Sequence, residues 1–204
     1  MQPFQCLTAT ACPLPFANID TDQLIPARFM KRSRAEGYGS FLLHDMRFSS
    51  DGSEIPGFSL NRPDWRNAQI VVARRNFGAG SSREAAVYAL VDYGVRCVVA
   101  PSFGDIFASN AVNNGLLPAC VDEHDAESLI RTLEAGVREI TVDLQAQTIT
   151  TNGVSAPFTV DPVWRMKLLN GWDDIDLTLS QGEAITQFTA DDAKKRPWAV
   201  PRTG

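Results

Sequence analysis

The sequence predicts an α/β fold in which a parallel βαβ core carries added β-hairpins. Two short apolar runs, Ile70-Val71-Val72-Ala73 and Cys97-Val98-Val99-Ala100, have the composition of buried strands. A glycine-rich turn and a helix over 82–93 are predicted between them, and a strand, a helix and a strand joined by short links form a right-handed parallel crossover. Apolar residues alternate with polar ones over 140–144, as in an antiparallel strand with one face in solvent.

The ends of the other elements follow from capping and turn residues. Gly94 suits the left-handed position that ends the first helix, and Asn152-Gly153 is a strong hairpin-turn signal. Proline after Asp161 favours the start of a helix there. The remaining predicted elements are a helix from Ser102 to 113–115, a strand over 117–121, a helix from Asp125 to Ala135, strands at 140–144, 148–150 and 158–160, and a helix from Asp161 to Gly171.

The length of 204 residues suits one domain, which we expect to span 1–204. Its first part, 1–66, is rich in proline, glycine and turn formers and is expected to be mostly loop. Residues 172–204 are expected to form a C-terminal extension beyond the last helix of the core.

Composition and charge exclude several classes of protein. A hydrophobic fraction of 44% and a charged fraction of 21% are typical of a globular domain. The formal net charge is −5, so no nucleic-acid partner is expected. No stretch approaches the length of a membrane span and no signal-peptide pattern begins the sequence, so we expect no membrane partner and a cytoplasmic location.

The four cysteines and two histidines do not have metal-binding spacing. No two cysteines form a C-x-x-C pair, and His44 and His124 lie far apart in the sequence. We therefore expect this chain alone to hold no metal ion and no iron–sulfur cluster. Cys97 stands in an apolar run and is expected to be a buried, reduced thiol.

The segment most suggestive of chemistry is Asn76-Phe77-Gly78-Ala79-Gly80-Ser81-Ser82-Arg83-Glu84. Its glycines allow a tight turn, and the helix that follows offers unpaired N–H donors and a partial positive charge. Arg83 adds a planar fork suited to a carboxylate, and Ser81 and Ser82 add hydroxyl groups. Such a site can hold a carboxylate and stabilise an enolate-like charge.

The segment has two other interpretations. The first is a plain turn in which a serine caps the helix and Arg83 is solvated. The second is a dinucleotide-binding loop, but Arg83 stands where that loop needs its third glycine, and no acidic residue ends the next predicted strand. A P-loop is excluded because the sequence has no Gly-Lys-Ser/Thr.

A second polar segment is Asn18-Ile19-Asp20-Thr21-Asp22-Gln23-Leu24-Ile25-Pro26. In an extended chain, Asp20 and Asp22 would point the same way. The alternative is a turn in which these side chains bond to nearby backbone, and chemistry alone favours this second interpretation.

Together these segments resemble the small subunits of the isopropylmalate isomerase family, in the aconitase superfamily. Two further matching segments are Ser102-Phe103-Gly104-Asp105-Ile106-Phe107 and Asn113-Asn114-Gly115-Leu116-Leu117-Pro118. The resemblance runs in order from the N-terminus to beyond Gly171. One departure is Ala85-Ala86, where the family usually has His-Ala.

The resemblance implies a swivelling β/β/α domain that closes over a large subunit, which carries a [4Fe–4S] cluster. It also implies a hydro-lyase that isomerises 2-isopropylmalate to 3-isopropylmalate in leucine biosynthesis. Two alternatives stay open: a small subunit of a related dehydratase of the methylmalate or citraconate type, and a non-catalytic anion- or nucleotide-binding module. A diacid substrate and the large subunit are therefore the expected partners.

The resemblance also assigns roles to individual residues. Ser81 corresponds to the catalytic base, and Asp22 corresponds to a member of the hydrogen-bond network around the active site. Arg83 corresponds to the residue that binds a substrate carboxylate, with Ser82 and Gly80 beside it. The loop that reads the substrate side group corresponds here to Arg28, Phe29, Met30, Lys31 and Arg32.

Overall fold

The computed structural model describes residues 1–80 and 83–199 and confirms the α/β fold. Its sheet has seven strands in the order β4-β3-β2-β1-β5-β6-β7. The pairs from β4 to β1 are parallel, and the pairs from β1 to β7 are antiparallel. The strands are β1 (Cys6–Leu14), β2 (Ile70–Ala73), β3 (Cys97–Ala100), β4 (Leu117–Cys120), β5 (Glu139–Asp143), β6 (Thr148–Thr151) and β7 (Val154–Pro157).

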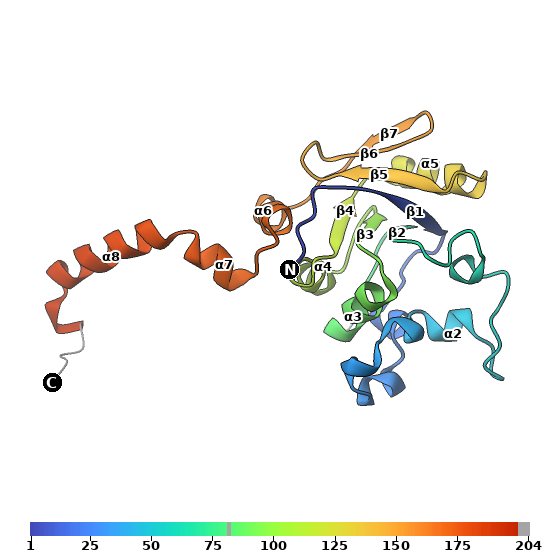
Figure 1. Ribbon diagram of the computed structural model, residues 1–204, viewed down its shortest axis with the longest axis horizontal. Helices are drawn as coiled ribbons and strands as arrows, with labels where there is room; N and C mark the ends of the chain where they lie inside the picture. Colours follow the sequence, from blue (N-terminus) through green and yellow to red (C-terminus); the bar gives the residue numbers. More distant parts are fainter. Residues whose placement is uncertain (81–82, 200–204) are drawn as a thin grey trace.

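Helices cover both faces of the parallel half of the sheet, with α3 on one face and α5 on the other (Figure 1). The segment between β1 and β2 is irregular and is held together by short helical turns. The α-helices are α1 (Thr21–Leu24), α2 (His44–Arg47), α3 (Glu84–Tyr93), α4 (Asp105–Asn113), α5 (Glu123–Glu134), α6 (Pro162–Asn170), α7 (Asp174–Leu179) and α8 (Gly182–Lys195). The 3-10 turns are η1 (Ala27–Lys31), η2 (Arg34–Glu36), η3 (Gly39–Phe41), η4 (Ser59–Asn61) and η5 (Pro197–Ala199).

Successive residues of the buried strands point into two separate hydrophobic clusters, one on each face of the sheet. In β2, Val71 packs into the cluster beneath α3, whereas Val72 packs into the cluster beneath α5. In β3, Val98 packs into the cluster beneath α3 and Val99 into the cluster beneath α5. This period of two explains why both strands have continuous apolar sequences rather than alternating ones.

The largest difference from the expectation for residues 1–66 is β1, which no sequence signal indicated. This strand lies at the centre of the sheet, with β2 parallel on one side and β5 antiparallel on the other. Its last four residues are buried even though they include Pro13, which has no N–H to donate to a neighbouring strand. The rest of 1–66 is loop and short turns, as predicted.

Three predicted helix starts were wrong, although the predicted ends at Gly94, 113–115 and Ala135 agree with the structure to within one residue. α3 begins at Glu84 rather than 82, and α4 begins at Asp105 rather than Ser102. Ser102 does not cap α4, because its hydroxyl accepts a hydrogen bond from Asn76 N at 2.9 Å. α5 begins at Glu123, two residues before the predicted cap at Asp125.

The C-terminal part agrees with the prediction up to Gly171. β6 and β7 form the hairpin around Asn152-Gly153, and the Asp161 side chain caps α6. The strand predicted at 158–160 was wrong, because β7 spans Val154–Pro157 and Thr159 makes only an isolated bridge with Cys120.

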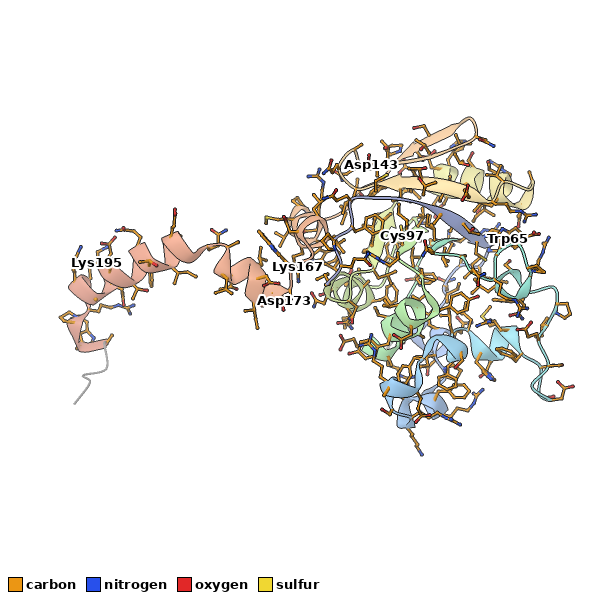
Figure 2. The ribbon with its side chains drawn as sticks, viewed as in Figure 1. Trp65, Cys97, Asp143, Lys167, Asp173 and Lys195 are labelled. Carbon is orange, nitrogen blue, oxygen red and sulfur yellow. The ribbon has the colours of Figure 1, made fainter. Side chains whose placement is uncertain are left out.

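Beyond Gly171 the chain forms an arm, residues 172–199, which extends away from the sheet (Figure 1). No residue of α7 or α8, both fully described, is buried. The arm is fixed at its root by Lys167, whose side chain is 4% exposed (Figure 2). The Lys167 ammonium donates to Asn113 Oδ1 and to Asp174 Oδ1, both at 2.6 Å.

Candidate functional site

The loops that follow β1, β2 and β3 are joined to one another by backbone hydrogen bonds. Gly78 N, in the loop after β2, donates to Ile19 O in the loop after β1 at 2.7 Å. On the other side, Gly104 N, in the loop after β3, donates to Phe77 O at 2.9 Å. The glycine-rich segment is therefore the middle of a three-loop layer at the ends of neighbouring strands, where sites of α/β proteins commonly form.

Two positions in this layer require glycine because the loops approach so closely. Gly78 has φ +72°, and a Cβ there would stand 2.2 Å from Cγ of Phe107. A Cβ on Gly104 would stand 2.6 Å from the carbonyl oxygen of Gly78. The glycines thus allow the loop after β3 to pack directly on the turn that leads to Arg83.

A contact that the sequence did not reveal joins the two polar segments. Asn76 Nδ2 donates to Asn18 Oδ1 at 2.9 Å, and both asparagines have left-handed backbone, with φ of +62° and +58°. Asparagine tolerates this conformation better than most residues, and that tolerance was the only available signal. The contact fixes the loop after β1 against the loop after β2.

Of the two interpretations of the segment around Asp20 and Asp22, the structure confirms the favoured one, a turn with local bonds to backbone, and not the extended chain. Asp20 caps α1, because its Oδ1 accepts a hydrogen bond from Gln23 N at 2.7 Å, while Asp20 N donates to Gln23 Oε1 at 2.9 Å. Asp20 therefore has the local structural role of a capping box. Asp22 lies within the first turn of α1 and is free to point elsewhere.

Asp22 and Arg83 come together although they are far apart in the sequence. The Arg83 guanidinium donates from Nη1 to Asp22 Oδ1, and the two side chains are 24% and 57% exposed. Arg83 precedes α3 as its N-cap residue, with extended backbone, instead of lying in the first turn. Its position at a helix start, half-buried and accessible, suits an arginine that meets an anionic ligand.

Two helices begin at this site without a side-chain cap. The N-cap residues, Arg83 for α3 and Gly104 for α4, accept no hydrogen bond from the helix through a described side chain. As far as the described side chains go, the first N–H groups of each helix are therefore left for an anion. A hollow of about 180 Å³ lies between the turn and α4, lined by Gly78, Gly80 and residues 104–107.

The two serines of the predicted site, Ser81 and Ser82, lie outside the described residues. Gly80 comes directly before them and has left-handed backbone with φ +96°. A Cβ on Gly80 would meet the Asp20 Cβ at 3.6 Å, an ordinary contact distance, so its backbone angle rather than crowding favours glycine here.

The predicted substrate loop is built from contacts among its own residues and their neighbours. The Phe29 ring stacks on Phe41 at 4.3 Å between ring centres, and it lies beneath the Arg28 guanidinium. Arg28 pairs with Asp45, and this hydrogen bond lowers the pKa of the Asp45 carboxyl to about 2.

The other three residues of the loop are less constrained. Met30 is 40% exposed and Lys31 is exposed, whereas Arg32 pairs with Glu36 at 3.4 Å. Of the two apolar side chains predicted to meet a substrate, Met30 is thus the more accessible, because Phe29 is engaged with Phe41.

The Cys97 thiol is buried as predicted, and burial raises its pKa. Across residues 1–80 and 83–199, no three side chains of His, Cys, Asp or Glu gather as metal ligands would. Over the same part of the chain, no helix has the length and apolar character needed to cross a membrane.

Comparison with family models gives two matches that together cover most of the chain. The model of the aconitase C-terminal domain matches residues 1–124, which include every residue of the candidate site. A second model, described as LeuD_N, matches residues 127–162.

Curated relatives match nearly the whole chain. A 3-isopropylmalate dehydratase small subunit from Cereibacter sphaeroides is 50% identical over 200 residues, covering 97% of this chain and 100% of the relative. The protein of the same name from Rhodospirillum centenum is 48% identical over 202 residues, with 98% and 100% covered.

A solved structure supports the fold. The crystal structure of a 3-isopropylmalate dehydratase (LeuD) from Methanocaldococcus jannaschii has a TM-score of 0.62 and 23% identity, and the match covers 90% of this chain and 99% of that one. The fold is therefore that of the swivelling domain implied by the sequence. With half of its residues identical to curated relatives over their full length, the chain belongs to the family of 3-isopropylmalate dehydratase small subunits.

Proposed function

We propose that this chain supplies one half of the active site of a hydro-lyase that converts 2-isopropylmalate to 3-isopropylmalate by dehydration and rehydration, in leucine biosynthesis. The observation that carries the proposal is the Arg83–Asp22 pair, placed beside Gly80 where two helices begin that no described side chain caps. This arrangement offers a fixed guanidinium and free backbone N–H groups to a substrate that has two carboxylates. The names and full-length identity of the relatives support the same reaction.

Arg83 binds one substrate carboxylate. Its Nη1 is engaged with Asp22, and the remaining donors of the guanidinium fork can reach a ligand. Asp22 keeps the guanidinium in place and also reduces its net charge, so the isolated subunit should bind a diacid only weakly. Gly80 and Ser82 contribute a backbone group and a hydroxyl beside Arg83.

Ser81 acts as the base that removes the proton next to a carboxylate. A serine hydroxyl is a poor base, so its alkoxide form needs a strongly positive surrounding potential. Arg83 and the N-terminus of α3, which begins at Glu84, supply part of that potential. The electrons of the broken C–H bond then form the double bond as the substrate hydroxyl departs.

The large subunit supplies the other half of the site. A [4Fe–4S] cluster held there provides a Lewis acid for the departing hydroxyl. This chain contributes as a single swivelling domain spanning 1–204 that closes over the partner, and we place the pair in the cytoplasm, in keeping with four free cysteines.

The loop from Arg28 to Arg32 contacts the side group of the substrate and determines which side group is accepted. Met30 offers an accessible apolar surface, and the aromatic stack of Phe29 on Phe41 supports it from behind. Ala85, half-buried at the start of α3, replaces the histidine usual in the family. A related diacid such as a methylmalate is therefore the second candidate substrate, and a panel of diacids assayed with the assembled enzyme separates the two.

Replacing Ser81 tests the mechanism directly. In the enzyme assembled with its large subunit, Ser81→Ala should lower kcat by at least a factor of about 100, because no other group takes the proton. The matched control is Ser155→Ala, at an exposed position in β7, which should leave kcat unchanged. Near-normal turnover of Ser81→Ala would remove this residue from the mechanism.

Replacing Arg83 by lysine tests carboxylate binding. Lysine keeps the charge but loses the two-pronged contact, so kcat/KM should fall by more than about tenfold, or about 1.4 kcal/mol. Arg131→Lys, at an exposed position of α5, is the control. A loss of less than about threefold at Arg83 would place carboxylate binding elsewhere.

A non-catalytic anion- or nucleotide-binding module is the competing hypothesis from another class. Such a module would bind a nucleotide by itself, whereas the proposed subunit needs its partner before it shows useful affinity for its ligand. Calorimetric titration of the isolated chain with ATP and with a diacid distinguishes the two.

A further inference from the structure

Arg47, the last residue of α2, is a buried cation that has no acidic partner among the described residues. It is 5% exposed, and its Nε and Nη1 donate to Asn61 Oδ1 at 3.0 Å and to Leu42 O at 3.3 Å. None of the ion pairs within residues 1–80 and 83–199 includes it. Glu54, whose charge reaches Arg47 from farther away, is itself paired with Arg66.

Arg47 lines a surface hollow of about 450 Å³. The Arg47 Cζ lies 5.2 Å from the ring centre of Phe48 and 5.1 Å from that of Tyr93, and both residues line the hollow. Gly37 and Gly39 also line it. The hollow is thus large enough for a small organic ion, and its one buried charge is positive.

Two acidic residues, Asp92 and Glu36, also line the hollow, and both already have partners. Asp92 pairs with Arg34 at 3.4 Å and also accepts a hydrogen bond from Tyr38 N at 3.0 Å. Glu36 pairs with Arg32 at 3.4 Å. Each of these carboxylates is neutralised by its own arginine, so neither compensates the charge of the buried Arg47 guanidinium.

We propose that this hollow binds a small carboxylate anion through the free donors of Arg47. A guanidinium has five N–H donors in a planar fork, and two of its three nitrogens make the hydrogen bonds described above. A buried charge without a partner is costly, and an anion in the hollow would remove that cost. The site does not depend on the proposed catalytic function.

The hollow is distinct from the candidate active site. Arg83 precedes α3 and Tyr93 ends it, and a helix of 10 residues is about 15 Å long. The chain from the substrate loop to the hollow runs along this helix, and Arg34 lies over the Tyr88 ring at 3.7 Å. One continuous segment, residues 28–40, therefore contains the proposed substrate loop at its start and residues that line the hollow at its end. An anion at Arg47 would contact that end, and its link to the substrate loop rests on the proposed function.

Nuclear magnetic resonance of the full chain, labelled with ¹⁵N, provides a test with local readouts. Sodium succinate is the probe, and sodium chloride at equal ionic strength is the control. We expect saturable shifts of the Gly37 and Gly39 amides, with an affinity in the millimolar range. Shifts equal to those in chloride, or shifts confined to Gly78 and Gly80, would overturn the proposal.

A matched pair of variants at Ser40 tests the charge without disturbing Arg47, whose removal could also unfold the segment that it holds to Asn61. Ser40 is exposed and lines the hollow. Ser40→Glu supplies a carboxylate from the chain itself, so succinate binding should weaken by at least about tenfold. Ser40→Gln has the same size without the charge and should bind as the wild type does. Equal binding by all three proteins would refute the site.

The same carboxylate chemistry could come from a side chain of the large subunit, and the assembled enzyme distinguishes the two sources. Calorimetric titration with succinate should still show weaker binding for Ser40→Glu than for Ser40→Gln after assembly, because the hollow stays open to a free ligand. Loss of that difference, together with weaker assembly of Ser40→Glu alone, would assign the carboxylate to the partner and overturn a free-ligand site.

Discussion

The strand-end loops and the C-terminal arm are opposite kinds of structure within one chain. In the loops, packing is so close that a single methyl group on Gly78 would overlap the Phe107 ring. In the arm, α8 is a regular helix of 14 residues, yet Phe188 is 67% exposed and no residue of the helix is buried. Tolerance to substitution should therefore follow tertiary contacts and not the regularity of the secondary structure.

The comparison predicts the largest effect at Gly78. Gly78→Ala forces both a left-handed alanine and a collision with Phe107, and we expect a loss of about 3 kcal/mol of unfolding free energy. Urea unfolding measures it. Gly52→Ala is the control, because Gly52 has φ +83° but a Cβ there would meet no described atom within 4 Å; it should cost only about 1 kcal/mol. Equal losses would mean that the loops can move apart.

The parts of the fold that the sequence predicted are those governed by local rules. Gly94 and Gly171 have left-handed φ and end α3 and α6, and Asp161 caps α6 with Pro162 at its first position. Apolar runs correctly placed β2 and β3. Each of these features depends on residues only a few positions apart, so a single sequence contains the information.

The parts that were missed depend on partners distant in the sequence. β1 contains Pro13 and few β-branched residues, and pairing with β2 and β5 makes it a central strand. Ser102 has the composition of a helix cap, but Asn76 N donates to its hydroxyl instead.

The candidate site shows the same division. Its motif and the closeness of the two polar segments were predicted through the family resemblance. The favoured turn interpretation already placed a local bond between an aspartate side chain and backbone in this segment, and Asp20 makes one as the cap of α1. The pairing of Asp22 with Arg83 needed the three-dimensional structure.

The root of the arm should be intermediate between the two regions. Lys167 is buried, and Asp174 is the one carboxylate that pairs with it among the described residues. Asp174→Asn should lower the unfolding free energy by about 1–2 kcal/mol, because the buried ammonium loses its charged partner. The loss should not be larger, since the ammonium keeps its bond to Asn113 and the Asp174 side chain is 74% exposed. The control is Asp191→Asn, in an exposed pair with Lys194, which should change the unfolding free energy by less than about 0.5 kcal/mol. A similar cost at both positions would argue against a fixed root.

The substrate loop provides a smaller and pH-dependent effect. The hydrogen bond from Arg28 lowers the pKa of Asp45 to about 2 in the folded chain, below the value of about 3.9 for a free aspartate. The pair therefore stabilises the fold above pH 4, and this contribution disappears as the pH falls towards 2. Because both side chains are more than half exposed, solvent screens the pair and its contribution should be small.

Unfolding free energies of wild type and Asp45→Asn test this sign. The wild type should be the more stable at pH 6, and the two curves should converge near pH 2. High salt at pH 6 should reduce the difference by screening the exposed pair. A gap between the proteins that widens as the pH falls would contradict the assignment.

The smallest effect is expected from removing the largest piece of structure. Truncation after Ser180 deletes α8 but retains Asp174 and the capping box between Asp173 and Asp176 that begins α7. Since α8 buries no residue, the unfolding free energy of the rest should change by no more than about 0.5 kcal/mol. An isolated helix of 14 residues is only marginally stable in water, so α8 contributes helix without contributing to the core. A loss above about 1 kcal/mol in urea unfolding would show that α8 packs against the sheet domain in solution, and the contrast between arm and loops would then fail.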